Sequence, residues 1–320
     1  MWLRVLIAYA CLNASAYAAD WKPERPVEIV AMSGPGGAND VIARVLQRVM
    51  QQKKLVDAPL NVVSKVGAGG VIAWSYLNQH AGDAHYITVA SPSLLLNQIS
   101  GGGKGDPQGL TPLALLFSEY IVIAVRDDSP LKSGRDLVQR LKADPSSVSV
   151  AVATARGGVQ HVAAGLLTKA AGADVRKLKV VVFNAGSESI AAVLGGHVDI
   201  VSTAAANAAQ HVQSGRLRVL GVAAPNRLEG LYASAPTWKE QGYDTVASNW
   251  RSVLAPKGIS ATQTAFWDDT LSRLVKLPEW NDDVKKNYWV NNYLDSRASR
   301  AYFASQVDEL RGVLGDLLAK

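Results

Sequence analysis

Three segments of the chain share one arrangement, in which a buried strand runs into a turn of small residues and a helix follows. The arrangement occurs at residues 27–44, 148–165 and 180–194. Each turn leaves unpaired backbone N–H groups beside the positive end of a helix dipole. Helix starts of this kind bind carboxylates and phosphates, so the sequence predicts an anion-binding site built from these turns.

The first turn, Gly34-Pro-Gly-Gly37, is followed by Asn39 and Asp40. A P-loop needs a Lys-Ser or Lys-Thr pair after its glycines and a dinucleotide site needs GxGxxG, and this turn has neither. A tight turn without a ligand is the alternative. Binding is favoured because ligands of open α/β sheets lie at the carboxyl ends of strands. Asp40 would repel an anion, so we expect its carboxylate to turn aside and complement the helix dipole.

The second turn carries a cation, because Arg156 directly precedes Gly157 and Gly158. A guanidinium beside a helix start can hold a carboxylate through two hydrogen bonds, so we expect Arg156 to contact the ligand. A solvated surface position is the alternative for this arginine. His161 lies in the first turn of the same helix. A helix N-terminus lowers imidazole basicity, so we expect a neutral side chain that forms hydrogen bonds.

The third turn begins at Asn184, and we expect Ser187 to be the N-cap of its helix and also a donor to the ligand. Asn249 and Arg251 are candidates for the cleft wall on a later segment of the chain. Trp250, between them, is expected to lie in the core.

Catalysis and metal binding are the weaker hypotheses. No GxSxG motif places a serine as a nucleophile. The remaining histidines lack the spacing of metal ligands: His80, His85, His197 and His211. The one cysteine, Cys11, lies in the N-terminal segment, so a mature chain would have no thiol nucleophile. We therefore expect no catalytic residue, no metal and no cofactor; an enzyme acting on a small organic acid is the least favoured alternative.

Strands and helices that would position these turns alternate along most of the chain. Predicted strands are residues 27–32, 61–64, 86–90, 120–125, 148–153, 179–183, 198–203, 217–223 and 248–255. Capping-box sequences begin at Ser133, Thr237 and Ser260, and after Ser260 the pattern is purely helical. The alternation predicts an α/β fold whose parallel sheets are covered by helices.

The chain has 320 residues and a formal charge of +6. Single cores stop growing at about 250 to 300 residues, so the length predicts two domains. Residues 1–19 combine a basic start, a short apolar stretch and a small-x-small ending, which predicts a secretory signal peptide and a soluble periplasmic protein. A lipid anchor on Cys11 is not expected. The mild positive excess suits an anionic ligand, and no dense Lys/Arg stripe indicates nucleic-acid binding.

Two apolar strands end in turn sequences, after Val125 and after Ala224, where the chain is expected to pass between domains. We expect domain 1 to comprise residues 20–124 and 225–320, and domain 2 to be the inserted residues 125–224. The two connections would form the hinge, and the helical C-terminal tail would pack on domain 1. The protein is expected to be a monomer.

Nine segments, in one order over nearly all of the chain after the signal, resemble the Bug (TctC-like) substrate-binding proteins of tripartite tricarboxylate transporters. They are Arg25-Pro-Val-Glu-Ile-Val30, Pro35-Gly-Gly-x-x-Asp40 with Ala43-Arg44, Gly67-Ala-Gly-Gly70, Leu110-Thr-Pro112, Gly157-Gly-Val-Gln-His161, Leu194-Gly-Gly-His-Val-Asp199, Ser214-Gly-Arg-Leu-Arg218, Pro236-Thr-Trp-Lys-Glu-Gln-Gly242 and Asn249-Trp-Arg-Ser-Val-Leu-Ala-Pro256.

This resemblance implies a type II periplasmic binding protein fold, with two α/β domains, a two-stranded hinge and a carboxylate in the interdomain cleft. It implies that backbone groups at the Pro-Gly-Gly turn and at the helix starts of the second domain hold one carboxylate. The expected ligand-binding residues are Ser33, Pro35, Gly36, Gly37, Ala38, Asn39, Ser91, Thr154, Ala155, Arg156, Gly158, His161, Asn184, Ala185, Gly186, Ser187, Asn207 and Arg251.

The predicted function is capture of a small tricarboxylate or dicarboxylate in the periplasm and its delivery to the membrane subunits of a tripartite tricarboxylate transporter. A carboxylate sensor that reports to a signalling partner would use the same cleft and is the main alternative.

Overall fold

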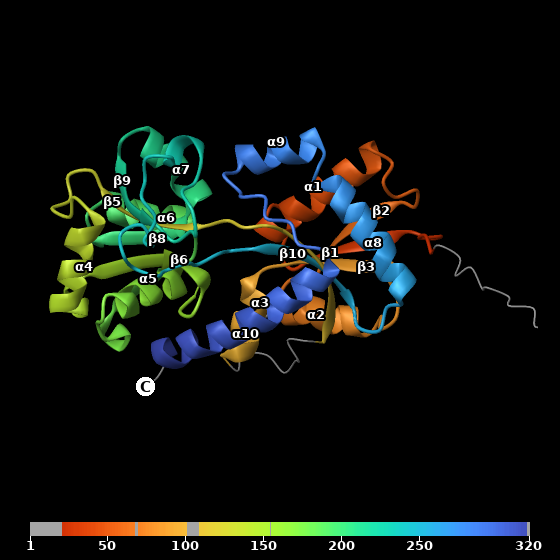
Figure 1. The fold of residues 1–320 in the computed structure, drawn as a ribbon, viewed down its shortest axis with the longest axis horizontal. Helices are drawn as coiled ribbons and strands as arrows, with labels where there is room; N and C mark the ends of the chain where they lie inside the picture. Colours follow the sequence, from red (N-terminus) through yellow and green to blue (C-terminus); the bar gives the residue numbers. More distant parts are fainter. Residues whose placement is uncertain (1–20, 68–69, 101–108, 154, 319–320) are drawn as a thin grey trace, which may run out of the picture.

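The computed structural model describes residues 21–67, 70–100, 109–153 and 155–318. The predicted signal segment and Thr154 lie outside the described residues. Two α/β units stand side by side, each built around its own five-stranded sheet (Figure 1). The predicted α/β fold class is confirmed, but each sheet is mixed and not purely parallel as expected, because one strand of each runs antiparallel to both of its neighbours. All nine predicted strands are present with ends displaced by at most three residues.

The first sheet has the strand order β2-β1-β3-β10-β4. β1, β2 and β3 run parallel, and β10 runs antiparallel to both of its neighbours. Alternate residues of β1 enter different cores, since Ile29 packs on one face and Val30 on the other. The strands are β1 (Val27–Ala31), β2 (Leu60–Ser64), β3 (Tyr86–Ala90), β4 (Leu110–Phe117) and β10 (Arg251–Pro256).

Helices cover both faces of this sheet. Leu46, Trp267 and Trp280 fill the core on one face. The helices there are α1 (Ala38–Gln52), α8 (Ala261–Leu274) and α9 (Pro278–Lys286). Leu94 and Leu310 belong to the core on the other face. The helices there are α2 (Val71–Asn78), α3 (Pro92–Ile99) and α10 (Ser296–Leu318).

The second sheet has the strand order β7-β6-β8-β5-β9. The strands are β5 (Ile121–Arg126), β6 (Ser149–Ala153), β7 (Lys179–Phe183), β8 (Ile200–Ala204) and β9 (Leu217–Val222). Leu137 and Leu167 fill the core on one face, and Ile190 and Ala208 fill the core on the other. The helices are α4 (Gly134–Ala143), α5 (Val159–Ala170), α6 (Gly186–Leu194) and α7 (Ala205–Gln213), with short 3-10 turns η2 (Pro145–Ser147), η3 (Val175–Lys177) and η4 (Gly230–Tyr232).

Two of the predicted capping boxes start helices. Ser133 and Ser260 each accept a hydrogen bond from the backbone N–H three residues later, and the side chain at that later residue accepts one in return. Thr237 and Glu240 exchange the same two bonds, at 2.8 and 3.0 Å, but a turn follows instead of a helix. The box therefore orders the backbone locally even where the chain does not continue as a helix.

Strand β4 was absent from the predicted set. Pro112 interrupts its sequence, and a proline cannot donate to a sheet ladder. β4 lies at the edge of the first sheet, and its register with β10 shifts between Val253 and Leu254, beside the partner of Pro112. Edge positions and bulges are the places in a sheet that tolerate proline.

The chain crosses between the sheets at residues 118–120 and 248–250. Tyr120 and Ser248 form an isolated bridge there, and the N–H of Asn249 donates to the carbonyl of Glu119 at 2.8 Å. All of β5 belongs to the second sheet, so these crossings differ from the positions expected at Val125 and Ala224. The apolar run of β5 lies within the second sheet because it pairs with both β8 and β9. The division of the chain into two domains at stated residues stays a prediction.

The sequence predicted that the C-terminal tail packs on the first unit, and helix α10 does so while also reaching the second unit. It contacts β4 and α3 of the first unit and also α5 of the second. Val162 of α5 belongs to the same core cluster as Leu310 and Leu314 of α10. The helix has 23 residues, and at 1.5 Å per residue it is about 35 Å long, long enough to reach the second unit. Figure 1 shows α10 running from the first unit to the underside of the second.

Candidate functional site

The carboxyl ends of the parallel strands in both sheets meet at the crossing segments. Phe117 at the end of β4 pairs with Arg251 at the start of β10, and Ser252 pairs with Ala90 at the end of β3. In the second sheet, the first residue of β5, Ile121, pairs with the last residue of β8. Each crossing therefore joins the carboxyl edge of one sheet to the carboxyl edge of the other. The three predicted turns of small residues, which we call the glycine-led turns, follow β1, β6 and β7 on these edges.

In the first turn the carboxylate of Asp40 is used by the turn itself. Its Oδ2 accepts hydrogen bonds from the N–H of Gly36 and from Nε of Arg44, both at 2.9 Å. The bond from Arg44, followed by that from Gly36, lowers the pKa of Asp40 despite its burial. Ser33 Oγ accepts the N–H of Asp40 at 3.1 Å. The carboxylate is thus turned aside, as predicted.

Backbone donors remain at the start of α1. Gly36 has a positive φ of 78°, and Gly37 is the N-cap with no side-chain hydrogen bond. Ala38 and Asn39 follow, and among the described residues no acceptor takes their N–H groups. Pro35, Gly36 and Ala38 are exposed, and Asn39 is half-buried. These free donors are the orphan groups of a helix start, available to an anion.

The side chain of Arg156, in the second turn, does not point outward past the carboxyl ends of the strands, where a ligand is expected. The exposed guanidinium donates through Nη2 to the carbonyl of Val180 at 3.2 Å. Val180 is the second residue of β7, whose carboxyl end is at Phe183. The side chain therefore runs back along this edge strand.

His161 is buried beside that turn, with 2% of its surface exposed. Its Nδ1 accepts the N–H of Gly157 at 2.9 Å. Burial, and secondarily the charge of Arg156, lowers the pKa of His161 to about 4. The imidazole is neutral and forms a hydrogen bond, as predicted. Gly158 is the N-cap of α5, and the exposed Ala155 lies just before the turn glycines.

The third turn differs from the prediction at its cap. Ala185, not Ser187, is the N-cap of α6, and Ser187 is an exposed residue of the first helical turn. Glu188 reaches back instead and accepts the N–H of Asn184 at 3.1 Å. The helix therefore begins one residue before Ser187.

The fold brings two predicted residues of the second unit into close approach. A Cβ placed on Gly186 would lie 2.7 Å from Nδ2 of Asn207, so only a glycine fits there without movement. Asn207 itself donates weakly to Thr203 Oγ1 at 3.5 Å. Ser91 is buried on the first unit, as the N-cap of α3.

Arg251 lies between the crossings and is 5% exposed. Its Nη1 donates to the carbonyls of Asn249 and Trp250 at 2.9 and 3.0 Å, and Nη2 lies 3.8 Å from the carboxylate of Glu119. Asn249 Nδ2 donates to the same carboxylate at 2.9 Å. Arg251, which was predicted to contact the ligand, therefore joins the two crossings. Trp250 is fully buried, as expected.

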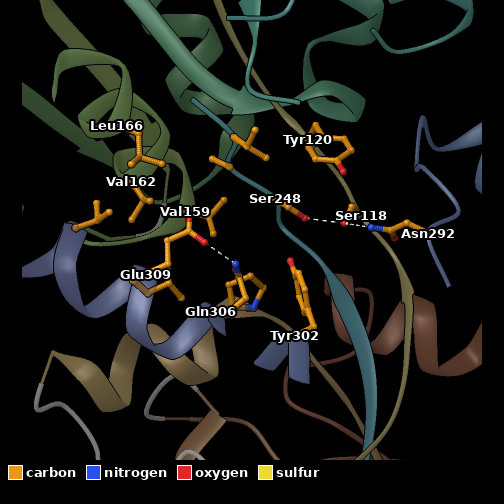
Figure 2. Close-up of a pocket in the computed structure, with 15 residues that line it drawn as sticks. Ser118, Tyr120, Val159, Val162, Leu166, Ser248, Asn292, Tyr302, Gln306 and Glu309 are labelled. Carbon is orange, nitrogen blue, oxygen red and sulfur yellow. Dashed lines mark hydrogen bonds between the residues drawn. The ribbon is translucent and has the colours of Figure 1, made fainter. Parts of the chain in front are cut away.

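A cavity of about 170 Å³ lies beside the crossings, and Figure 2 shows the residues around it. Ser118, Tyr120 and Ser248 come from the crossings, Val159 and Val162 from α5, and Tyr302, Gln306 and Glu309 from α10. We call it the hinge cavity. None of the 17 predicted residues that the structure describes lines it, although Pro92 and Val159 directly follow the N-caps Ser91 and Gly158.

Neutral hydrogen-bonding groups dominate the polar lining of the hinge cavity. Ser118 Oγ accepts from Ser248 Oγ at 2.7 Å and from Asn292 Nδ2 at 2.9 Å. Asn292 Oδ1 is buried without a partner among the described residues. Burial raises the pKa of Tyr120 and of Tyr302, so both hydroxyls remain protonated donors. No Lys, Arg or His is among the described lining residues.

The lining residues of the hinge cavity come from positions as distant as 92 and 313. Ser118 and Ser248 could have been suspected, because Ser118 is a polar residue shortly before the predicted strand 120–125 and Ser248 is the polar first residue of the predicted strand 248–255. Asn292 and Tyr302 carry no comparable signal, because only the packing of the C-terminal tail brings them to the crossings.

The described residues contain no cluster of acidic, histidine or cysteine side chains that could hold a metal ion. In the same parts of the chain, no helix is long and apolar enough to cross a membrane.

Residues 42–313 match the family described as "Tripartite tricarboxylate transporter family receptor", TctC. Protein BugT of Bordetella pertussis (strain Tohama I) is 28% identical over 318 residues, covering 95% of this chain and 89% of BugT.

Solved structures show the same fold. A TctC solute binding protein from Polaromonas, without ligand, has a TM-score of 0.79 at 22% identity, covering 92% of this chain and 99% of that one. MatC from Rhodopseudomonas palustris, with bound malate, has a TM-score of 0.72 at 20% identity, with 91% and 99% covered.

Proposed function

The chain belongs to the tripartite tricarboxylate transporter receptor family, and from this membership we propose that it is a periplasmic binding protein for a small organic carboxylate. Its family and fold are those of solute-binding receptors and not of enzymes. We propose that a dicarboxylate or tricarboxylate binds between the two units and is handed to the membrane subunits of a tripartite transporter. The malate bound to MatC supports the dicarboxylate class.

The observation that carries this proposal is the meeting of the two carboxyl edges. In open α/β sheets, ligands bind outside the carboxyl ends of the strands. Here the turns after β1, β6 and β7 supply helix starts from both units around one junction. A ligand bound there would receive donors from both units at once, as a receptor that closes on its ligand requires.

Backbone N–H groups, in this proposal, hold the carboxylate more than arginine side chains do. Arg156 is bonded to Val180, and Arg251 is buried between the crossings. The N–H groups of Ala38 and Asn39 have no acceptor among the described residues. Hydrogen bonds to a charged group contribute about 1.5–3 kcal/mol each, so the loss of one such donor should weaken binding measurably.

A single substitution tests the role of these donors. Proline is tolerated at the first helical position, where it removes the N–H and little else. Ala38 is that position in α1, and the preceding Gly37 has the extended backbone that proline requires (φ −73°, ψ 161°). Ala38→Pro should weaken dicarboxylate binding roughly ten-fold while leaving the unfolding midpoint nearly unchanged. Isothermal titration with malate, succinate and citrate measures the first quantity, and thermal unfolding the second.

The matched control is Ala261→Pro at the first position of α8. α8 follows Pro256, the end of β10 that lies away from the crossings. This variant should bind as the parent chain does. Equal dicarboxylate affinity of the two variants would show that the start of α1 is not part of the binding site. The proposed function itself would fail if none of the organic acids tested stabilised the parent chain and only neutral sugars or cations did so.

A further inference from the structure

A second face of helix α10 lines a cavity that the proposed function does not use. Tyr302, Gln306 and Glu309 of α10 line the hinge cavity. Phe303 and Val307 lie on another face of the same helix and line a separate cavity of about 310 Å³. Both cavities thus share α10 as a wall. We call the second one the α3–α10 cavity.

The α3–α10 cavity has an apolar body. Leu94 and Leu95 of α3, Leu110 of β4 and Leu254 of β10 join Phe303 and Val307 around it. Its volume falls within the range of about 300–1,000 Å³ that is usual for small-molecule sites, and apolar lining with a few polar groups is their usual character.

This cavity lies away from the meeting carboxyl edges. Leu110 is the first residue of β4 and pairs with Pro256, the last residue of β10. Phe117 and Arg251 form the opposite end of the same pair of strands, where the crossings begin. A ligand in the α3–α10 cavity would therefore occupy a different place from one between the two units.

Among the described residues that line the cavity, the two charged ones are both cations. Lys257 and Arg300 are exposed, and neither has an ion pair or a side-chain hydrogen bond within the described residues. Arg311, farther along α10, instead pairs with Asp308 at 3.5 Å. An apolar body with an unneutralised positive edge complements a molecule with an apolar tail and one negative end.

We propose that the α3–α10 cavity is a second ligand site, for a medium-chain acyl monocarboxylate. The acyl chain lies among Leu94, Leu254 and Phe303, and the carboxylate lies at Lys257 and Arg300. This goes beyond the proposed capture of a small dicarboxylate, because the class of ligand and the place of binding both differ.

Octanoate is the probe, measured by isothermal titration on the full mature chain. Affinity should rise roughly three- to four-fold for each methylene added from butanoate through hexanoate to octanoate. Octanamide, which lacks the charge, should bind several-fold more weakly than octanoate. Saturating malate should leave the octanoate affinity unchanged. Competition by malate would place octanoate between the units and overturn the proposal.

Two pairs of variants locate the site. Ala304→Phe fills the cavity from an exposed position on α10 and should abolish octanoate binding, whereas Ala301→Phe, exposed on the same helix but not lining the cavity, should not. Arg300→Gln should weaken octanoate about three- to five-fold, and Arg297→Gln should have no effect. Equal octanoate affinities within each pair would overturn the proposal even if malate binding is intact. If the parent chain binds octanoate as expected but none of the small organic acids tested, only the proposed function fails.

Discussion

At the scale of single residues, several charged and titratable groups of the crossings and turns are engaged in the fold. Asp40 holds its own turn together, Arg251 joins the two crossings, and His161 accepts a backbone N–H. Each is nearly inaccessible to water, with 1%, 5% and 2% of its surface exposed. Their electrostatic effects should therefore appear mainly as pH-dependent stability and only secondarily as ligand affinity.

His161 makes such a pH dependence testable. Its folded pKa of about 4 lies below its ordinary value of 6.5, so between these values the unfolded chain binds a proton that the folded chain excludes. The stability contributed by the neutral imidazole is complete above about pH 6.5 and is lost as the pH falls towards 4, by up to about 3 kcal/mol. His161→Asn, which keeps an acceptor but cannot titrate, should remove this loss. Denaturant unfolding at pH 7 and pH 4.5 measures it.

His197→Asn serves as the control, because His197 is exposed. Its unfolding free energy should change with pH as that of the parent chain does. If His161→Asn also retains the parent's full loss between pH 7 and 4.5, His161 is not the group responsible.

At the scale of elements, α10 depends on a close approach to α5. A Cβ on Gly165 of α5 would lie 2.6 Å from Leu317 of α10, whereas a Cβ on Gly312 of α10 would meet nothing within 4 Å. Both glycines are interior to their helices, so alanine should favour helix formation at both positions by roughly 0.5–1 kcal/mol. The different surroundings should reverse the sign at one of them.

Gly165→Ala should therefore destabilise the protein by about 1–3 kcal/mol, because the added methyl must displace Leu317. Gly312→Ala should stabilise it by up to about 1 kcal/mol. Urea unfolding of the two variants measures both effects. Stabilisation by Gly165→Ala would show that the end of α10 moves off α5 at little cost.

At the scale of the whole molecule, the two units are joined by residues 118–120 and 248–250 and bridged by α10. A carboxylate held by helix starts of both units favours the conformation in which both reach it. Because the crossings are few, we expect closure to take place there as a hinge motion. On closure, either the contact between α10 and α5 must shift, or part of α10 must move together with α5.

Small-angle scattering should accordingly show a smaller radius of gyration at saturating dicarboxylate than without it. Ala38→Pro should need roughly ten-fold more ligand to reach the same decrease, because closure follows occupancy. An unchanged radius at calorimetrically verified saturation would show that the two units do not move on binding.

Much of the fold could be read from local sequence. The limits of β3 and β7 coincide with their predicted ranges, and the boxes at Ser133 and Ser260 start helices as expected. Periodicity and caps act over a few residues, so they are visible without knowledge of distant contacts. The glycine-led turns and their helix starts were predicted for the same reason. The neutral state of His161 was predicted from its place at a helix start, but burial is the main cause of its lowered pKa.

Other features depended on contacts between distant segments. Arg156 turned to the edge of β7, Arg251 became buried between the crossings, and α10 reached across both units. The hinge cavity joins Ser118 to Tyr302, which no local pattern relates. Residue types and spacing determine which groups a turn offers, because backbone geometry there is local. Where a long side chain points, and which helix covers which cavity, is decided by packing between segments far apart in the chain.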